Sequence, residues 1–409
     1  MNTLDTIINK GYSAYFFGFG AIDFWLGSNL FKETNCPVHI LTNADTTDLA
    51  KLFDDLRFPG VDLADAALDV NERTWYFRCA DSINDYKSSF ALLDFYRDCK
   101  TRAFYYPRGI HPFLKQVKQN LVKTSVNKKT NKEIDPLQIF QDGFNPDIEY
   151  TQLLMDAALI LAKYFDTDSG AEKYIKKIAA RFNSFYENLQ SNNFTSGQTN
   201  LLPEKQRVFL SELITSPNPG LGFELLKSCG FLNKFWSELA ILDEADHSKD
   251  FHPEGNAWEH TMETFRHRKS GTGPQSINNY DLTLSLGLLL HDSGKPIATS
   301  AGSHRYDGHA QLGEIQAQRF LERLGFGQSI TKDVCFLVRN HMLPAALPRL
   351  PLFRTGEIMS SPLFPLLMEL YRCDESSSFK GLDGYYESSA AYQQFLRNKR
   401  NPYRNLVYR

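Results

Sequence analysis

The pattern of hydrophobic and polar residues changes character about one third of the way along the chain. Before residue 145, short apolar runs rich in β-forming residues alternate with Gly, Asp and Asn turns. This pattern predicts a small α/β or α+β head. The predicted strands are residues 12–17, 38–42, 74–79 and 90–96, and a helix is predicted over 45–53.

From residue 147 the apolar positions recur at helical spacing. Leu154, Ala157, Ala158 and Leu161 form one such stripe. A polar stretch rich in turn residues, 191–205, interrupts the helices. We therefore predict a multidomain chain with a head at 1–145, a helical neck at 146–245, an all-α part at 246–375 and a basic tail at 376–409.

Composition narrows the class of protein. A length of 409 residues favours two or three domains, and a formal charge of -3 excludes a uniformly basic nucleic-acid coat. Local basic segments remain, between Pro112 and Lys132 and after Glu387. The six cysteines form no C-x-x-C pair, and no apolar stretch approaches about 20 residues. These features predict a cytoplasmic protein with reduced thiols and no membrane association.

Histidine is concentrated in one part of the second half of the chain. Eight of the ten histidines lie between His247 and His341. His341 and Asp374 each continue an apolar helical stripe, so both should point inward. A lone buried histidine is usually an ordinary core residue. Several independent stripes that each bury such a group favour a metal site instead, because unbonded polar groups are costly to bury.

The candidate ligands comprise four imidazoles and two carboxylates. They are His260, His291, Asp292, His309, His341 and Asp374. This mixed set suits Mn, Fe, Co, Ni or Mg better than a structural zinc, and six ligands favour two divalent ions. The chemistry expected is phosphoester hydrolysis, with Asp292 bridging both ions and Lys295 neutralising a phosphate oxygen. Of the other clustered histidines, His252 and His304 are expected at a pocket rim, and His247 and His267 at the surface.

The same residues resemble a known superfamily. The segment His291-Asp292-Ser293-Gly294-Lys295, with His260 and Asp374, is similar to the H…HD…D signature of the HD superfamily of metal-dependent phosphohydrolases. His309 and His341 match the extra ligands of its two-metal members. From about residue 213 onward, the chain also resembles the HD half of bacterial CCA-adding tRNA nucleotidyltransferases, which implies phosphatase and phosphodiesterase activity there.

The head resembles the polymerase head of the same nucleotidyltransferase family, with losses. Gly18 matches its glycine-rich turn, although Phe19 replaces the second turn glycine, and Arg97-Asp98 matches its Arg-Asp motif. The resemblance implies nucleotide binding by Gly18, Gly20, Arg97 and Asp98. The paired aspartates of the family should fall at positions 37 and 39, where this chain has Pro37 and His39. Because a proline side chain offers no metal ligand, the resemblance implies a pseudo-polymerase head.

The leading hypothesis is therefore a metal-dependent phosphohydrolase or phosphodiesterase that acts on nucleotides or RNA ends, with an inactive head. A second hypothesis is a tRNA CCA-adding or poly(A)-type nucleotidyltransferase that remains active through displaced acids such as Glu33, Asp45 or Glu72. A third is a non-catalytic nucleotide-binding or RNA-binding protein. Each predicts nucleotide or RNA, including tRNA, as the partner. The oligomeric state is left open.

Overall fold

The computed structural model describes two compact units. One is built mainly from Met1–Pro217 and Leu221–Cys229, and the other mainly from Gly230–Lys269 and Gly273–Arg409. The residues described are 3–27, 38–59, 64–70, 73–86, 92–107, 109–110, 114, 146–165, 171–191, 201–245, 255–269, 280–300, 306–378 and 381–398. Over these residues, no helix has the length and apolar character needed to cross a membrane.

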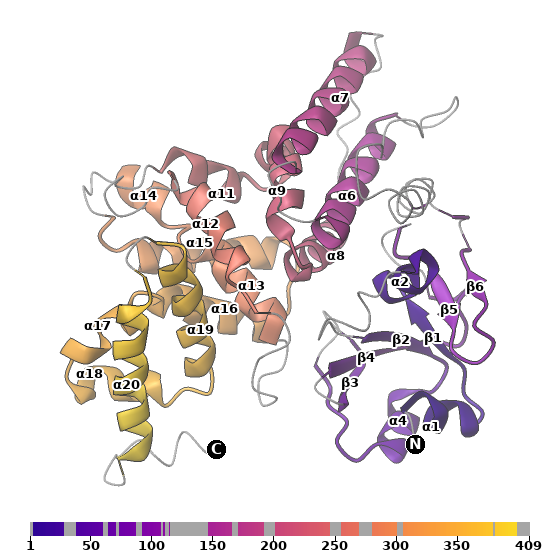
Figure 1. The fold of residues 1–409 in the computed structure, drawn as a ribbon, viewed down its shortest axis with the longest axis horizontal. Helices are drawn as coiled ribbons and strands as arrows, with labels where there is room; N and C mark the ends of the chain where they lie inside the picture. The colour runs from indigo at the N-terminus through magenta and orange to yellow at the C-terminus, as the bar shows by residue number, and fades with distance from the viewer. Residues whose placement is uncertain are drawn as a thin grey trace. The chain divides into compact units, whose positions relative to one another are not determined.

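The first unit begins with a mixed six-stranded sheet (Figure 1). The sheet order is β3-β4-β2-β1-β5-β6, and only the pairing of β2 with β4 is parallel. The elements of this part are α1 (Thr3–Asn9), β1 (Ala14–Phe17), α2 (Phe19–Leu26), β2 (Val38–Thr42), α4 (Thr46–Leu52), β3 (Ala66–Val70), β4 (Arg73–Cys79), β5 (Tyr96–Asp98) and β6 (Phe104–Tyr105).

Local sequence explains the shortest connections in this part. Helix α2 ends at Gly27, which has a left-handed φ of 70°. Helix α4 begins after Asp45, whose side chain accepts a hydrogen bond from the backbone N–H of Asp48. The predicted strands at 38–42 and 74–79 coincide closely with β2 and β4. The strand expected at 90–96 instead starts at Tyr96, and β3 was not predicted.

The strand register separates two faces of the sheet. Phe16 of β1 lies opposite Ile40 and Arg97, and the Arg97 guanidinium lies 4.1 Å from the ring of Phe24 on α2. Phe17 and His39 belong to the other face, where their ring centroids are 5.7 Å apart. Helix α2 therefore packs against the first face, and His39 lies on the second.

The rest of the described chain is helical. The helices are α6 (Pro146–Tyr164), α7 (Ala171–Ser191), α8 (Pro203–Thr215), α9 (Pro219–Ser228), α10 (Phe231–Phe235), α11 (Ser237–Ala240), η1 (Ile241–Glu244), α12 (Ala257–Arg266), α13 (Tyr280–Leu290), α14 (Lys295–Ser300), α15 (His309–Arg323), α16 (Gln328–Asn340), α17 (Leu343–Ala346), η2 (Leu347–Arg349), α18 (Leu352–Met359), α19 (Phe364–Ser376) and α20 (Asp383–Arg397). The region expected as a basic tail thus contains a helix, α20. The mixed sheet followed by helices is consistent with the expected fold class, and the domain boundaries stay predictions.

Helix α13 is the centre of the second unit. Every residue from Leu282 to Leu290 is buried, and the helix contacts α12, α16 and α19. A helix that is apolar all round must be enclosed by other helices, because it has no face suited to water. The turn that follows α13 begins with His291 and Asp292, so their side chains start from the interior of the unit.

A glycine permits close packing beside this turn. A Cβ atom added at Gly294 would lie 2.0 Å from the carbonyl oxygen of His309 and 2.5 Å from the backbone nitrogen of Gly313. Both atoms belong to the backbone of α15, so they cannot rotate away. Gly294 therefore sets how closely the turn after α13 approaches α15.

We expect Gly294→Ala to destabilise the second unit by at least about 2 kcal/mol, because overpacking against backbone forces the helices apart. Gly220→Ala is the matched control: a Cβ atom added at Gly220 would have no neighbour within 4 Å, and stability should change by less than about 1 kcal/mol. Thermal unfolding of both variants tests this. Equal melting temperatures would contradict the close approach.

Candidate metal centre

A capping box fixes the start of α12, the helix that carries His260. Helix α12 begins with a capping box, in which the Asn256 side chain accepts from the backbone N–H of Glu259 and the Glu259 carboxylate accepts from the backbone N–H of Asn256. One turn further along, His260 lies on the buried face and is 1% exposed. The cap therefore fixes the start of the helix that carries His260 inward.

The other candidate residues come from four further places in the fold. His291 and Asp292 follow α13, His309 is the first residue of α15, and His341 is the C-cap of α16. Asp374 lies in the last turn of α19. Helix ends from distant parts of the chain thus meet, and the side chains of the histidines and Asp292 are buried.

Backbone carbonyl groups orient three of the imidazole rings. The Nδ1 atoms of His291, His309 and His341 lie 2.7 to 2.8 Å from the carbonyl oxygens of residues 288, 306 and 338. A carbonyl oxygen only accepts hydrogen bonds, so Nδ1 carries the hydrogen in each ring. In the neutral rings, Nε2 therefore has a free lone pair, which is the form that binds a metal ion.

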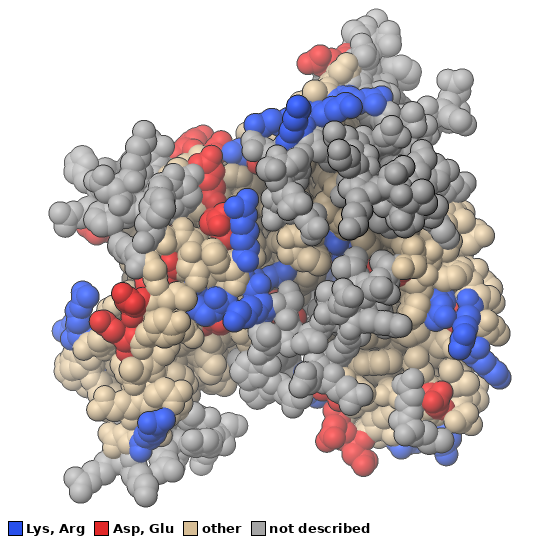
Figure 2. All heavy atoms as spheres, in the orientation of Figure 1, with Lys and Arg blue, Asp and Glu red and all other residues tan. Residues whose placement is uncertain are grey.

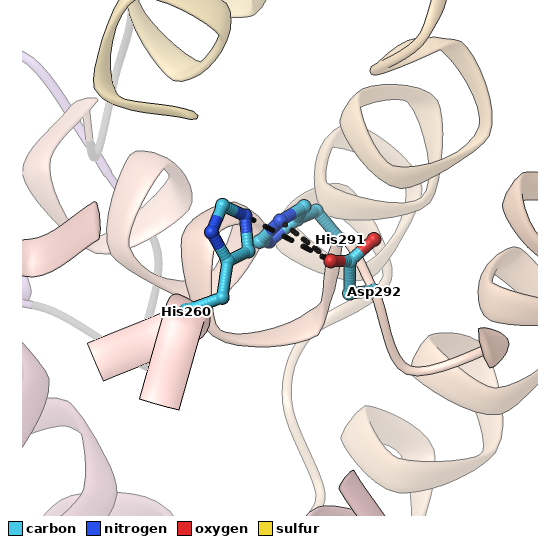
Figure 3. A group of neighbouring side chains, drawn as sticks. All are labelled: His260, His291 and Asp292. Carbon is cyan, nitrogen blue, oxygen red and sulfur yellow. Dashed lines mark ion pairs between the residues drawn. The ribbon is translucent and has the colours of Figure 1, made fainter. Parts of the chain in front are cut away.

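The Nε2 atoms of all four histidines face the carboxylate of Asp292. Figure 3 shows His260 and His291 beside this carboxylate. Its Oδ2 lies 3.3 Å from Nε2 of His291 and 3.9 Å from Nε2 of His260. Its Oδ1 lies 3.7 and 3.8 Å from the Nε2 atoms of His309 and His341. Asp292 thus belongs to two overlapping groups of ligand-type side chains, and each of its oxygens faces one pair of histidines.

Two features of this arrangement favour a bound cation. The Nε2 atoms of His309 and His341 are only 3.1 Å apart, so their lone pairs repel unless a proton or a metal ion lies between them. Nε2 of His291 is buried and takes part in no hydrogen bond among the described residues. A buried polar atom without a hydrogen bond is costly, and a metal ion would satisfy it.

Electrostatics favours the protonation states that metal binding requires. Burial lowers the pKa of His309, and burial together with the nearby His291 lowers the pKa of His341 to about 4. Burial alone would raise the pKa of Asp292, but His291 and Lys295 outweigh it and hold that pKa well below its usual range. Neutral imidazoles of His309 and His341 therefore face an ionised carboxylate.

Asp374 is placed differently from the other candidates. Its Oδ1 lies 2.9 Å from Nε2 of His260, whereas Nδ1 of His260 lies 3.2 Å from Oγ of Ser377. The Ser377 hydroxyl donates its hydrogen to the carbonyl oxygen of Asp374, so its oxygen is left to accept from His260. Ser377 orients the His260 ring, and its role was not foreseen because serine has no distinctive spacing there.

Lys295 contacts the cluster through the carboxylate of Asp292. Its Nζ lies 2.6 Å from Oδ2 of Asp292 and 5.8 Å from the centre of the Tyr306 ring. Lys295 thus forms an ion pair with Asp292, and its expected contact with a phosphate oxygen stays a prediction. The structure brings the four histidines and Asp292 together, with Asp374 in contact with His260. Their assignment as ligands also stays a prediction.

Of the four remaining clustered histidines, one lies among the described residues. His267 is the C-cap of α12, and its side chain is 33% exposed, in keeping with a position near the surface. His247, His252 and His304 lie outside the described residues, as do the lysines of the basic segment between Pro112 and Lys132.

The candidate residues of the head have packing roles in this structure. Gly18 has a φ of 59° at the start of α2, and Gly20 lies in its first turn. Arg97 stacks on Phe24, and the Asp98 carboxylate accepts hydrogen bonds from the backbone N–H groups of Lys100 and Thr101. Binding of nucleotide by these four residues stays a prediction.

Comparison with known proteins gives an independent indication of function. The chain is 32% identical over 155 residues to the CC-adding tRNA nucleotidyltransferase of Thermus thermophilus, a match that covers 36% of this chain and 34% of that relative. It is 28% identical over 142 residues to the Multifunctional CCA protein of Halorhodospira halophila, covering 35% and 32% of the two chains. The protein of that name in Alkalilimnicola ehrlichii is 29% identical over 174 residues, covering 42% and 38%.

The matches correct the leading functional hypothesis. Each spans only about a third of the relative's length, and no profile of a known protein family matches the chain. Nevertheless, these relatives are named for CC addition or as CCA proteins, so the expectation of a phosphohydrolase as the main activity is wrong. The ligand-type residues indicated what a metal centre can do, but not which reaction the protein performs. The chain is thus similar, over about a third of its length, to tRNA nucleotidyltransferases of the CCA-adding type.

Proposed function

We propose that this protein is a tRNA nucleotidyltransferase that binds divalent metal ions. The observation that carries the proposal is the 155-residue similarity to a CC-adding tRNA nucleotidyltransferase. The expected partners are tRNA and nucleoside triphosphates, and the expected location is the cytoplasm. The catalytic acids are not assigned: β2 has the sequence VHILT and contains none. Of the displaced acids considered, Asp45 caps α4, and Glu33 and Glu72 lie outside the described residues.

A row of cations on α7 supports contact with RNA. Lys173, Lys177 and Arg181 are exposed at four-residue intervals, and Lys176 lies beside them. The buried residues Ile175, Ile178 and Phe182 occupy the opposite side of the helix. Figure 2 shows blue side chains along this helix. Successive cations are on the order of 6 Å apart along the helix axis, a spacing suited to phosphates of an RNA backbone.

The first prediction concerns nucleotide addition. Purified full-length protein, incubated with tRNA that lacks its terminal nucleotides, labelled CTP or ATP, and Mg²⁺ or Mn²⁺, should incorporate label into tRNA. Incorporation in His291→Ala should stay within about threefold of the unsubstituted protein, because no residue of the sheet belongs to the histidine cluster.

A second candidate function is the binding of tRNA or nucleotide without addition. The observation that favours it is His39, which occupies a β2 position where the resemblance implies an acid. Tight tRNA binding with no incorporation under any of these conditions would replace the first proposal by the second. Absence of both binding and incorporation would exclude both.

We also propose that the histidines and Asp292 hold two divalent ions of the Mn, Fe, Co, Ni or Mg group, with Asp292 between them. His260 and His291 would hold one ion, with Asp374 beside His260, and His309 and His341 would hold the other. A bound divalent ion would supply positive charge that relieves the repulsion between the inward-facing Nε2 lone pairs.

Metal binding gives the next prediction. The purified protein should retain divalent metal in elemental analysis. After removal by a chelator, added metal at 100 times its dissociation constant should stabilise the fold by about 2.7 kcal/mol, visible as a higher melting temperature. His291→Ala should lose both effects, whereas His267→Ala, on the same unit but outside the cluster, should keep them. Identical metal content and melting behaviour in the two variants would contradict the assignment.

A further inference from the structure

Exposed apolar side chains gather on one short stretch of the second unit. Among the described residues, nine large hydrophobic side chains are exposed, and three of them, Met342, Leu352 and Phe353, lie within residues 342–353. Phe353 is 75% exposed, more than any other of the nine. Exposed apolar residues scattered singly are ordinary, whereas apolar residues gathered together indicate a contact surface.

Helix α20 covers one side of the elements that carry these residues. It contacts α17, η2 and α18, and the Ser388 hydroxyl of α20 donates a 2.7 Å hydrogen bond to the carbonyl oxygen of Pro344 in α17. The exposed residues of 342–353 therefore lie on the sides that α20 leaves open. Figure 2 shows a largely tan surface where α18 and α20 lie, so apolar and uncharged atoms dominate it.

Helix α18 has one buried face and one exposed face. The residues buried against the rest of the unit are Thr355, Gly356 and Met359. The exposed residues that follow Leu352 on this helix are Phe353, Arg354 and Glu357. Residues three positions apart are neighbours on a helix surface, so Arg354 and Glu357 adjoin each other on the exposed face, with Phe353 beside them.

The charged residues of this stretch have both signs. Between residues 342 and 359 they are Arg349, Arg354 and Glu357. All three are exposed, and none forms an ion pair with another described residue. The Arg354 guanidinium lies 5.8 Å from the centre of the Phe353 ring. Aromatic residues, Met and Arg without Lys are the composition typical of protein–protein interfaces.

This surface fits a second copy of the chain better than RNA or an anionic lipid surface. Glu357 lies on the exposed face of α18, where its carboxylate would repel phosphate groups. In a two-fold contact a surface meets itself, so each copy must carry both members of every ion pair. The exposed face of α18 meets this condition because it carries both Arg354 and Glu357.

We propose that the protein forms a homodimer in which α18 packs antiparallel against α18 of a second copy. A two-fold axis midway between positions 355 and 356 brings Arg354 of each copy opposite Glu357 of the other, because the two residues are equally far from that point. Both Phe353 side chains are buried at this contact. The exposed residues of α17 and η2 extend it beyond one short helix, as an interface of about 1,000 Å² requires. The proposal is independent of the proposed enzyme activity.

The first test is sedimentation equilibrium of the full-length protein, which should show a dimer with a dissociation constant of about 10 µM or lower. Phe353→Ala should raise that constant at least about tenfold, because each dimer loses two buried rings. Phe58→Ala is the matched control: Phe58 is 60% exposed on the first unit, and its loss should leave the constant unchanged.

The charged contact has its own pair of variants. Arg354→Glu and Glu357→Arg should each raise the dissociation constant at least about tenfold, because like charges then face each other. An equimolar mixture of the two variants should dimerise again, since one copy then carries only acids at these positions and the other only arginines. This recovery separates a lost contact from a lost fold. Arg319→Glu, at an exposed arginine of α15, is the control and should dimerise normally.

The outcomes decide between the possible occupants. A protein that stays monomeric up to about 100 µM overturns the inference. A dimer that Phe353→Ala leaves unchanged, or a mixture of the two charge variants that stays monomeric, also overturns it. A monomer whose tRNA binding is weakened by Phe353→Ala would assign the surface to RNA instead. Nucleotide addition is measured separately, so its absence would reject the proposed enzyme activity and leave the dimer standing.

Discussion

The carboxylate of Asp292 is the group on which the histidine cluster depends. Four imidazoles face it, and three of them are held in that orientation because Nδ1 donates to a backbone carbonyl oxygen of the preceding helix or turn. The Nε2 atoms cannot turn toward solvent without breaking those bonds. Burial of this many acceptors in one place is costly unless a cation is shared among them. This cost is the physical reason to regard the cluster as a metal centre.

The packing of the second unit determines the position of this cluster. Helix α13 is buried on every side, so the turn after it delivers His291 and Asp292 to the interior and not to the surface. Gly294 then lets that turn approach the backbone of α15, which brings His309 to the carboxylate. A small residue and an apolar helix thus determine where the polar groups meet.

Among the described residues, the head sheet has no comparable cluster of ligand-type side chains. In place of an acid, β2 carries His39, and Arg78 of β4, on the same face, pairs with Asp65. The similarity to CC-adding and CCA proteins is the basis of the proposed tRNA nucleotidyltransferase function.

The sequence alone determined the helical periodicity, the strands at 38–42 and 74–79, and the ligand-type residues from His260 to Asp374, because periodic burial and residue chemistry are local properties. It did not predict β3, the later start of β5, or the part of Ser377 in orienting His260, since each depends on partners far along the chain. Nor did it rank the functions correctly, because a ligand set specifies available chemistry and not the reaction. Only the tertiary structure decided that the Nε2 atoms of His309 and His341 lie 3.1 Å apart. It also decided that one carboxylate oxygen of Asp292 faces His291 and the other faces His309. Helix packing sets those distances, and packing is a property of the whole unit.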